Sequence, residues 1–252
     1  MKIWFLTRSL YPYQKTGGGQ IRLGQVKSLE ALGWDITIVM PNFTTNNIEI
    51  IDNIIQIPLI QNQKITSILE RIGFYEDYLD VWVKDTYKYL KDKVNKEDFI
   101  FATSGGELGM IKLGSLLKNE IDCRFVINFH DPLAYSLVHN LKLNNKFHVS
   151  REDQEKKYLR NSDLIITSSK SNKESLCAKY PEYEIKIKNN YFGYIKKVHP
   201  TRTEINSSTK LRIAYVGNMG KLQKPEILYY VYNKLFNKDD IEIYFIGNIA
   251  NY

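Results

Sequence analysis

A short apolar strand followed by a glycine-rich turn and a helical stretch occurs twice in this sequence. The first copy is residues 2–7 followed by Gly17-Gly18-Gly19, and the second is residues 211–216 followed by the turn 217–220. Such turns place backbone N–H groups and the positive end of a helix where a phosphate can bind. Two copies favour two nucleotide-binding α/β domains. Because the sequence ends soon after the second turn, we expect one whole domain and the opening of another.

Composition and charge narrow the class of protein. The 252 residues are 43% hydrophobic and 25% charged, which is typical of a globular chain. No apolar run approaches the roughly 18 residues of a membrane span, so we expect a cytoplasmic protein. The net charge of +7 suits phosphate-bearing molecules, anionic membranes or nucleic acid. The basic residues are spread along the chain without a nucleic-acid-binding motif, and we expect no nucleic-acid partner.

Cysteine and histidine usage argues against a metal site. Cys123 and Cys177 are far apart in the sequence and lack metal-ligand spacing, so we expect two reduced, buried thiols. Two cysteines and four scattered histidines do not make a zinc site.

Strands and helices alternate through the first 190 residues. Strand patterns occur at 2–7, 35–40, 50–58, 98–103, 124–130, 163–168 and 185–189, and helical patterns at 20–32, 65–72, 75–94, 107–119, 152–161 and 171–180. This alternation predicts an open, doubly wound parallel sheet of the Rossmann-like kind. Ligands of such sheets bind at the carboxyl ends of the strands. The candidate site loops are therefore 7–19, 103–107, 130–131 and 168–169.

The turn-rich, polar segment 200–210 is the predicted linker between domains. The domains are then 1–199 and 211–252, the second opening with a strand at 211–216, a helix at 225–236 and a strand at 241–246. A single β-α-β unit cannot bury both faces of its sheet alone.

The first glycine turn has a functional and a structural interpretation. Gly17 to Gly19 could let the backbone approach a pyrophosphate, or they could be a flexible connection. A dinucleotide fingerprint would need a third glycine where Arg22 stands, and an acidic residue where the second strand ends in Met40-Pro41. The sequence therefore argues against a nicotinamide dehydrogenase.

His130 and Asp131 close the strand at 124–130. A histidine and a carboxylate at this end of a strand are placed to touch a sugar hydroxyl or a transferring group. The alternative is a histidine whose ring is satisfied by neighbouring backbone.

The stretch 78–93 is aromatic, basic and helical in period. It could lie on an anionic membrane, which would make the protein peripheral at the inner face of that membrane. The alternative that we favour is packing against the sheet, with Trp82, Leu79 and Leu90 buried.

Several segments together resemble the retaining glycosyltransferases of the two-domain GT-B fold, specifically family 4. The resemblance runs along essentially the whole chain. It is carried by Tyr11-Pro12 through Gly17-Gly18-Gly19, by the segment 29–39, by Asn128-Phe129-His130-Asp131-Pro132, and by the segments 161–169 and 186–190. The turn 215–223 is similar to a Gly-Asn-x-Gly-x-x-Gln variant found in surface-polysaccharide assembly, with Asn218 where arginine is commoner and Pro225 after Lys224.

The resemblance implies a function for several residues. His130 and Asp131 would be catalytic and touch the transferred sugar; the donor diphosphate would lie near Gly17, Gly18, Gly19, Gly217, Asn218, Lys221 and Lys224. The first domain would supply the acceptor pocket, with Thr103, Ser104 and Glu107 as candidates. The nucleotide sugar would be a substrate, the acceptor a saccharide or a lipid-linked saccharide, and neither cofactor nor metal is implied.

A non-catalytic sugar- or nucleotide-binding α/β module is the alternative to a glycosyltransferase, since fold alone does not fix function. In a catalytic protein Gly18 and His130 should face one cleft. We also expect that the 252-residue chain transfers no sugar by itself.

Overall fold

The computed structural model describes residues 1–14, 17–133, 146–193, 210–217, 225–235 and 240–247. The chain divides into two compact units, Met1–Lys197 and Val198–Tyr252. Apart from Lys210, the predicted linker at 200–210 lies outside the described residues.

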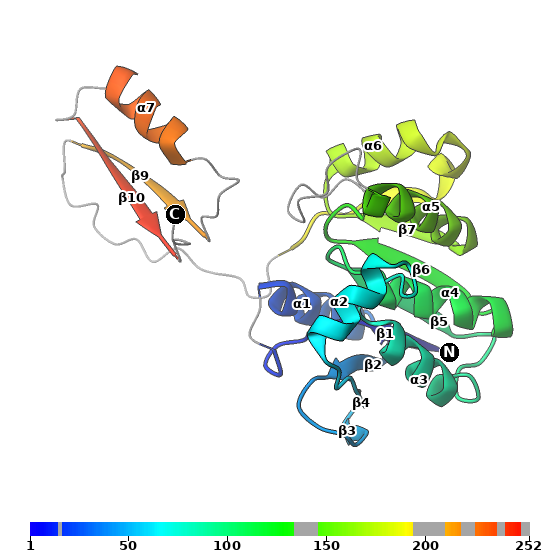
Figure 1. Ribbon diagram of the computed structural model, residues 1–252. Coiled ribbons are helices and arrows are strands. Elements are labelled where there is room, and N and C mark those ends of the chain that lie inside the picture. Colours follow the sequence, from blue (N-terminus) through cyan, green and yellow to red (C-terminus); the bar gives the residue numbers. More distant parts are fainter. Residues whose placement is uncertain (15–16, 134–145, 194–209, 218–224, 236–239, 248–252) are drawn as a thin grey trace. The chain divides into compact units, whose positions relative to one another are not determined.

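An eight-stranded sheet forms the centre of the first unit (Figure 1). Its strands are β1 (Lys2–Leu6), β2 (Asp35–Asn42), β3 (Glu49–Ile51), β4 (Ile54–Pro58), β5 (Phe99–Ser104), β6 (Arg124–Phe129), β7 (Leu164–Thr167) and β8 (Ile187–Asn189). Their order across the sheet is β3-β4-β2-β1-β5-β6-β7-β8. All neighbouring pairs are parallel except β3 and β4.

Helices cover the two faces of this sheet. They are α1 (Gly17–Ala31), α2 (Gln63–Arg71), α3 (Asp80–Leu90), α4 (Gly109–Ile121), α5 (Lys146–Asn161) and α6 (Lys170–Lys179), and the 3-10 helix η2 (Pro181–Lys186) precedes β8. The predicted doubly wound, Rossmann-like α/β fold is thereby confirmed.

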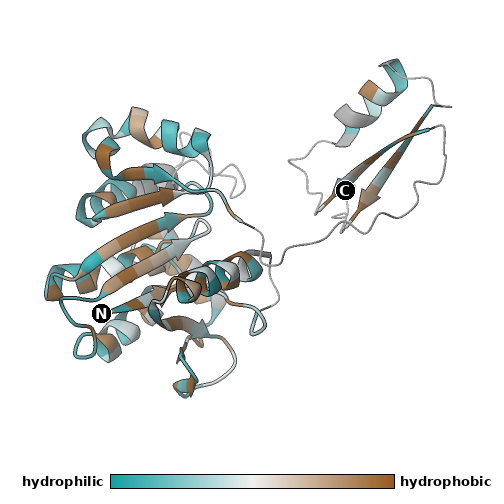
Figure 2. Cartoon of the chain, turned by 180° about the vertical axis from the view of Figure 1, so that it is seen from behind, coloured by the Kyte–Doolittle hydropathy of each residue, from teal (hydrophilic) through white to brown (hydrophobic). Residues whose placement is uncertain are grey.

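The core has two parts because successive side chains of a strand point to opposite faces of the sheet. In β1, Ile3 and Phe5 pack with Val26 of α1 on one face. Trp4 and Leu6 pack on the other face in the larger cluster, which α3, α4, α5 and α6 complete. The strands consequently appear as hydrophobic bands in Figure 2.

The structure corrects the predicted bounds of several elements. The helix predicted at 152–161 begins at Lys146, and the strand predicted at 185–189 begins at Ile187. Three further corrections have a local cause or change the character of the segment. The predicted strand at 50–58 is a hairpin, β3 and β4, whose turn places Asp52 at a φ of 52°, a conformation that aspartate tolerates better than most residues. The helix predicted from residue 75 begins at Asp80, because the carboxylates of Asp77 and Asp80 accept bonds from the backbone N–H groups of Leu79 and Glu76 before the helix starts.

The third correction concerns the first glycine turn, which is not a loop. Gly17, Gly18 and Gly19 form the first turn of α1. Leu32, the last residue of the helix predicted at 20–32, lies beyond the end of α1 and is 76% exposed.

The segment 78–93 packs against the sheet, as we favoured. Trp82, Leu79 and Leu90 are fully buried, and Tyr87 and Tyr89 pack against the same cluster. The segment therefore presents no tryptophan to a membrane. No helix among the described residues has both the length and the apolar character to cross a bilayer.

Both thiols are free. Cys123 is buried as expected, whereas Cys177 is half-buried.

The second unit is the β-α-β arrangement that the sequence predicts. β9 (Leu211–Val216) pairs in parallel with β10 (Ile241–Ile246), and α7 (Pro225–Leu235) lies between them in the chain. Apolar side chains of both strands are exposed, including Val216 and Ile246.

Packing of α4 on β6 generates the first prediction. A Cβ atom at Gly114 would overlap the ring of the fully buried Phe125. We expect Gly114→Ala to lower the free energy of unfolding by up to about 2 kcal/mol, because overpacking costs about 1–3 kcal/mol and the helix gains only roughly 1 kcal/mol from alanine. Denaturant unfolding followed by tryptophan fluorescence measures this loss.

Gly193→Ala is the matched control, since a Cβ atom at Gly193 meets nothing within 4 Å. Unchanged stability of Gly114→Ala would show that α4 and β6 are less tightly packed than the structure indicates.

Candidate functional site

A cavity of about 340 Å³ opens at the edge of the first sheet where β1, β5 and β6 end. Its lining comes from the loop after β1, from the first turns of α1, from the loop between β5 and α4, and from residues that follow β6 and β8. The lining residues are Arg8, Ser9, Gln14, Gly18, Ile21, Arg22, Gly105, Glu107, His130, Asp131 and Phe192. This is the position that ligands occupy in open α/β sheets.

Four residues predicted from the sequence lie together in this cavity: Gly18, Glu107, His130 and Asp131. They come from three elements that are far apart in the sequence. Gly17 and Gly19 belong to the same helical turn as Gly18, and the N-terminus of α1 carries the positive end of its dipole.

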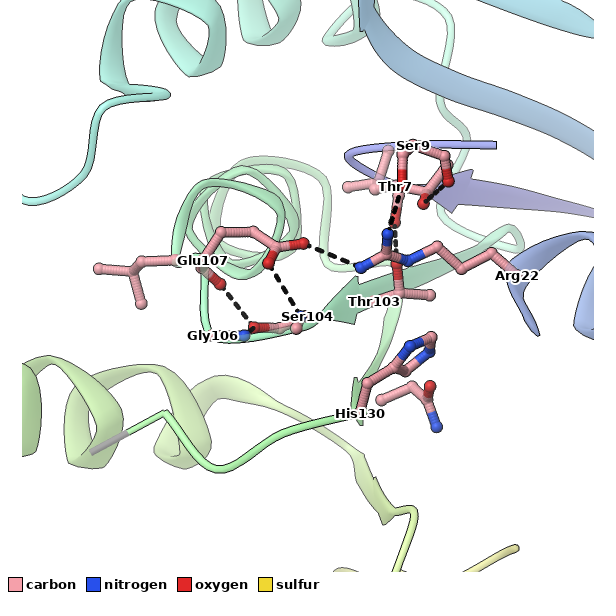
Figure 3. Close-up of polar contacts among 12 residues, drawn as sticks. Thr7, Ser9, Arg22, Thr103, Ser104, Gly106, Glu107 and His130 are labelled. Atoms are coloured by element: carbon pink, nitrogen blue, oxygen red, sulfur yellow. Dashed lines mark hydrogen bonds and ion pairs between the residues drawn. The ribbon is translucent and has the colours of Figure 1, made fainter. Parts of the chain in front are cut away.

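Arg22 is the residue at the centre of the polar contacts (Figure 3). Its Nη1 donates to Ser9 Oγ at 2.6 Å, and its Nη2 forms an ion pair with Glu107 Oε1 at 3.1 Å. Both charged side chains are almost fully buried. Burial lowers the pKa of the Arg22 guanidinium, and the carboxylate of Glu107 opposes that shift.

Two glycines make room for this guanidinium. A Cβ atom at Gly18 would lie 3.3 Å from Nη1, and one at Gly105 would lie 3.3 Å from Nη2. Arg22 is therefore held between the first turn of α1 and the loop after β5.

Glu107 also orders the loop in which it lies. Its Oε2 accepts a hydrogen bond from the Gly105 N–H at 2.9 Å, and its backbone carbonyl accepts one from Ser104 Oγ at 2.6 Å. Thr103 Oγ1 donates to the Leu6 carbonyl at 3.3 Å. Thr103 and Ser104 are fully buried and do not line the cavity, so their hydroxyl groups hold the loop together.

His130 lies directly after β6, with 9% of its surface exposed. Its backbone N–H donates to the Ser104 carbonyl at 2.7 Å, and its carbonyl accepts a bond from Ser168 Oγ at 2.7 Å. The edge-on ring of Phe192 is 4.8 Å from the imidazole, centre to centre. Burial and, to a lesser extent, the charge of Arg22 lower the pKa of His130 to about 3.

The imidazole is not satisfied by backbone, contrary to the structural interpretation of its motif. Its described hydrogen-bond partner is the Gln25 side chain, with His130 Nε2 and Gln25 Oε1 3.3 Å apart. Asp131 lines the same cavity and is exposed.

Charges in the lining balance. The described lining residues include two arginines, Arg8 and Arg22, and two carboxylates, Glu107 and Asp131, around a neutral His130. Such a cavity suits a neutral ligand rich in hydroxyl groups, which can exchange hydrogen bonds with these side chains. No group of three or more His, Cys, Asp or Glu side chains gathers as metal ligands among the described residues.

The second unit holds the remaining predicted site residues. Gly217 directly follows β9, and its backbone N–H donates to the Ile246 carbonyl at 2.9 Å. That N–H group is part of the sheet and does not point to a phosphate. Asn218, Lys221 and Lys224 lie outside the described residues.

The loops 7–19 and 103–107 selected from the sequence also supply Arg8, Ser9, Gln14 and Gly105 to the cavity. Sequence reasoning missed Ile21, Arg22 and Phe192, which lie outside those loops. Arg22 carries the clearest signal, since a charged residue three positions after the glycines stands where the buried face of α1 begins. Its meaning becomes visible only when Glu107 is found beside it.

No protein-family model and no curated protein matches the sequence. Among solved structures, the chain is similar to the catalytic domain of starch synthase IV from Arabidopsis thaliana bound to ADP and acarbose. The TM-score is 0.62, and the sequences are 10% identical over 99% of this chain and 69% of that one.

Two further similar structures concern trehalose-6-phosphate. An E. coli protein bound to UDP-2-fluoro glucose has a TM-score of 0.61 and 11% identity over 100% of this chain and 65% of its own. A trehalose-6-phosphate synthase has a TM-score of 0.59 and 10% identity over 99% and 64%. The chain therefore spans 64% to 69% of the length of these proteins. At such identities the likeness shows the shared α/β fold.

The buried ion pair generates a stability prediction. Glu107→Gln removes one charge and leaves the Arg22 guanidinium buried without its counter-charge, so we expect unfolding free energy to fall by about 3–5 kcal/mol. Denaturant unfolding measures the change. The control is Glu174→Gln, which breaks the exposed pair with Lys170 and should cost less than about 1 kcal/mol. Equal losses in the two variants would contradict the burial of the Arg22 pair.

The environment of His130 generates a pH prediction. Its pKa is about 3 in the folded chain and near 6.5 when unfolded, so between these values only the unfolded state binds this proton. The free energy of unfolding is therefore unaffected by this group above pH 6.5. It decreases as the pH falls from 6.5 toward 3, by at most about 1.4 kcal/mol per pH unit. NMR should show the His130 ring neutral from pH 8 down to pH 5. A midpoint near 6.5 would show that the ring is solvated.

Proposed function

We propose that this chain is the acceptor-side domain, with the start of the donor domain, of a retaining, family 4-like glycosyltransferase. It would transfer a sugar from a nucleotide-sugar donor to a surface-polysaccharide or glycolipid-type acceptor. The observation that carries the proposal is the single cavity that Gly18, Arg22, His130 and Asp131 line at the carboxyl edge of the sheet.

The chemistry of the cavity supports a sugar as the bound group. Paired arginines and carboxylates and a neutral imidazole offer both donors and acceptors to hydroxyl groups without a net charge. The N-terminus of α1 favours an anion such as a donor phosphate beside that sugar. Donors fixed near a leaving diphosphate would stabilise charge as its bond to the sugar breaks.

The structural neighbours support the same class. The starch synthase structure is bound to ADP and acarbose, and the E. coli structure is bound to UDP-2-fluoro glucose. The trehalose-6-phosphate synthase was studied as an enzyme that transfers a glycosyl group with retention. A sugar-binding module without activity is the second candidate, but the shared cleft of Gly18 and His130 favours a reacting site over a purely structural domain.

Ligand titration tests this function. We expect uridine, adenosine or guanosine diphosphate sugars to bind with dissociation constants on the order of millimolar, because a cavity of about 340 Å³ encloses only part of such a ligand. The resonances of the His130 ring should shift on binding. A panel in which no nucleotide sugar shifts His130 would overturn the proposal, and micromolar affinity would show a more complete site than we describe.

Gly18→Val should weaken this binding by about tenfold or more, since the branched side chain would displace the Arg22 guanidinium. Lys27→Val is the control, because it places the same branched side chain at an exposed position of α1. If the two variants lose the same amount of stability and bind the nucleotide sugar with the same affinity, Gly18 has only a structural role.

A further inference from the structure

Two polar side chains connect α1 to β6 and end on His130. Gln25 Nε2 donates to Asn128 Oδ1 at 3.0 Å, and Gln25 Oε1 lies 3.3 Å from His130 Nε2. Asn128 is 2% exposed and is the penultimate residue of β6, the strand that His130 directly follows. Gln25 follows Arg22 by three positions and therefore lies on the same face of α1.

The hydrogen-bonding capacity of these atoms fixes where the imidazole proton lies. A carboxamide oxygen only accepts hydrogen bonds, and a carboxamide nitrogen only donates them. Asn128 Oδ1 accepts a hydrogen bond from Gln25 Nε2, so the other end of the Gln25 carboxamide, its oxygen, faces His130. That oxygen requires a donor, so His130 Nε2 must carry a proton. A neutral ring has a single N–H, and Nδ1 is then left with a lone pair.

The charged groups around the ring favour its neutral form. Arg22 approaches from α1, and its charge opposes a second proton on the ring. Glu107, on the loop after β5, is committed to Arg22. Arg8 and Asp131 line the same cavity with opposite charges and are exposed. The ring edge contacts Phe192, which carries no charge.

We propose that Gln25 and Asn128 are positioning residues that hold His130 as the Nε2–H tautomer, so that Nδ1 is the ring nitrogen that accepts a hydrogen bond from a ligand hydroxyl. The ring hydrogen bond found among the described residues is that of Nε2, and none is formed by Nδ1. The identity of that hydroxyl as a sugar's rests on the proposed function, whereas the tautomer does not.

Nitrogen-15 NMR of the imidazole in the 252-residue chain at pH 8 tests the tautomer without any ligand. His130 is assigned by comparison with His130→Gln. We expect Nε2 to resonate as a protonated ring nitrogen and Nδ1 as an unprotonated one. The reverse pattern, or two averaged nitrogens, would overturn the proposal, and this measurement needs no variant of Gln25.

Variants of Gln25 then test whether this side chain keeps His130 in the Nε2–H tautomer. Gln25→Met keeps the size of the side chain and removes the acceptor, so the two nitrogen resonances should move toward each other. Gln25→Glu restores an acceptor and should restore the Nε2–H pattern while raising the pKa of His130. Lys27→Gln, at an exposed site of α1, should change neither. An unchanged pattern in folded Gln25→Met would show that Gln25 does not position the ring.

A nucleotide sugar added to the wild-type chain separates this proposal from the proposed function. With the tautomer correct, a shift of Nδ1 on binding supports both. The correct tautomer with no response to any nucleotide sugar would overturn the function and leave the positioning role intact.

Discussion

The sheet of the first unit buries both of its faces, and this constraint decides where polar chemistry can lie. Inside the sheet, backbone groups pair with one another and apolar side chains fill both layers. Most polar side chains can therefore gather only near the ends of the strands. Because β1, β5 and β6 are neighbours in the sheet, their ends bring together residues about 100 positions apart, such as Ser9 and Glu107. The cavity is a consequence of strand order.

The same constraint explains how a charge comes to be buried at that edge. A guanidinium removed from water is costly, and acceptors and a counter-charge reduce that cost. Nη1 of Arg22 donates to Ser9 and Nη2 pairs with Glu107, whereas the buried Nε has no hydrogen-bond partner among the described residues. The guanidinium fits because Gly18 and Gly105 have no side chains. Gly18, in the first turn of α1, therefore makes room for the guanidinium of Arg22 in the next turn of the same helix. This packing role is separate from any attraction of the helix N-terminus for a phosphate.

Local sequence patterns predicted most of the strands and helices. Features that depend on contacts between residues distant in the sequence could not be predicted in this way. Apolar runs rich in Ile and Val located the sheet, and the strand-end rule selected His130, Asp131 and Glu107 for one edge. The hairpin at Asp52 was missed because a strand pattern does not reveal a two-residue turn without glycine. Thr103 and Ser104 were assigned to a ligand because hydroxyl groups at a strand end look alike in sequence whether they bind a ligand or their own loop. Arg22 contradicted one motif, and its own role depends on a partner 85 residues away.

Burial and the charge of Arg22 both keep the His130 ring neutral, and its hydrogen bond to Gln25 sets which ring nitrogen carries the proton. Together these contacts limit what the ring can do. An imidazole whose pKa is about 3 rarely takes up a full proton at neutral pH, so it is a poor general base. It remains a good hydrogen-bond acceptor through one nitrogen, provided that the other nitrogen keeps its proton and the ring keeps its orientation. In the proposed transfer reaction the ring would therefore position a hydroxyl group. Hydrogen-bond donors near the diphosphate would stabilise the negative charge that develops as its bond to the sugar breaks.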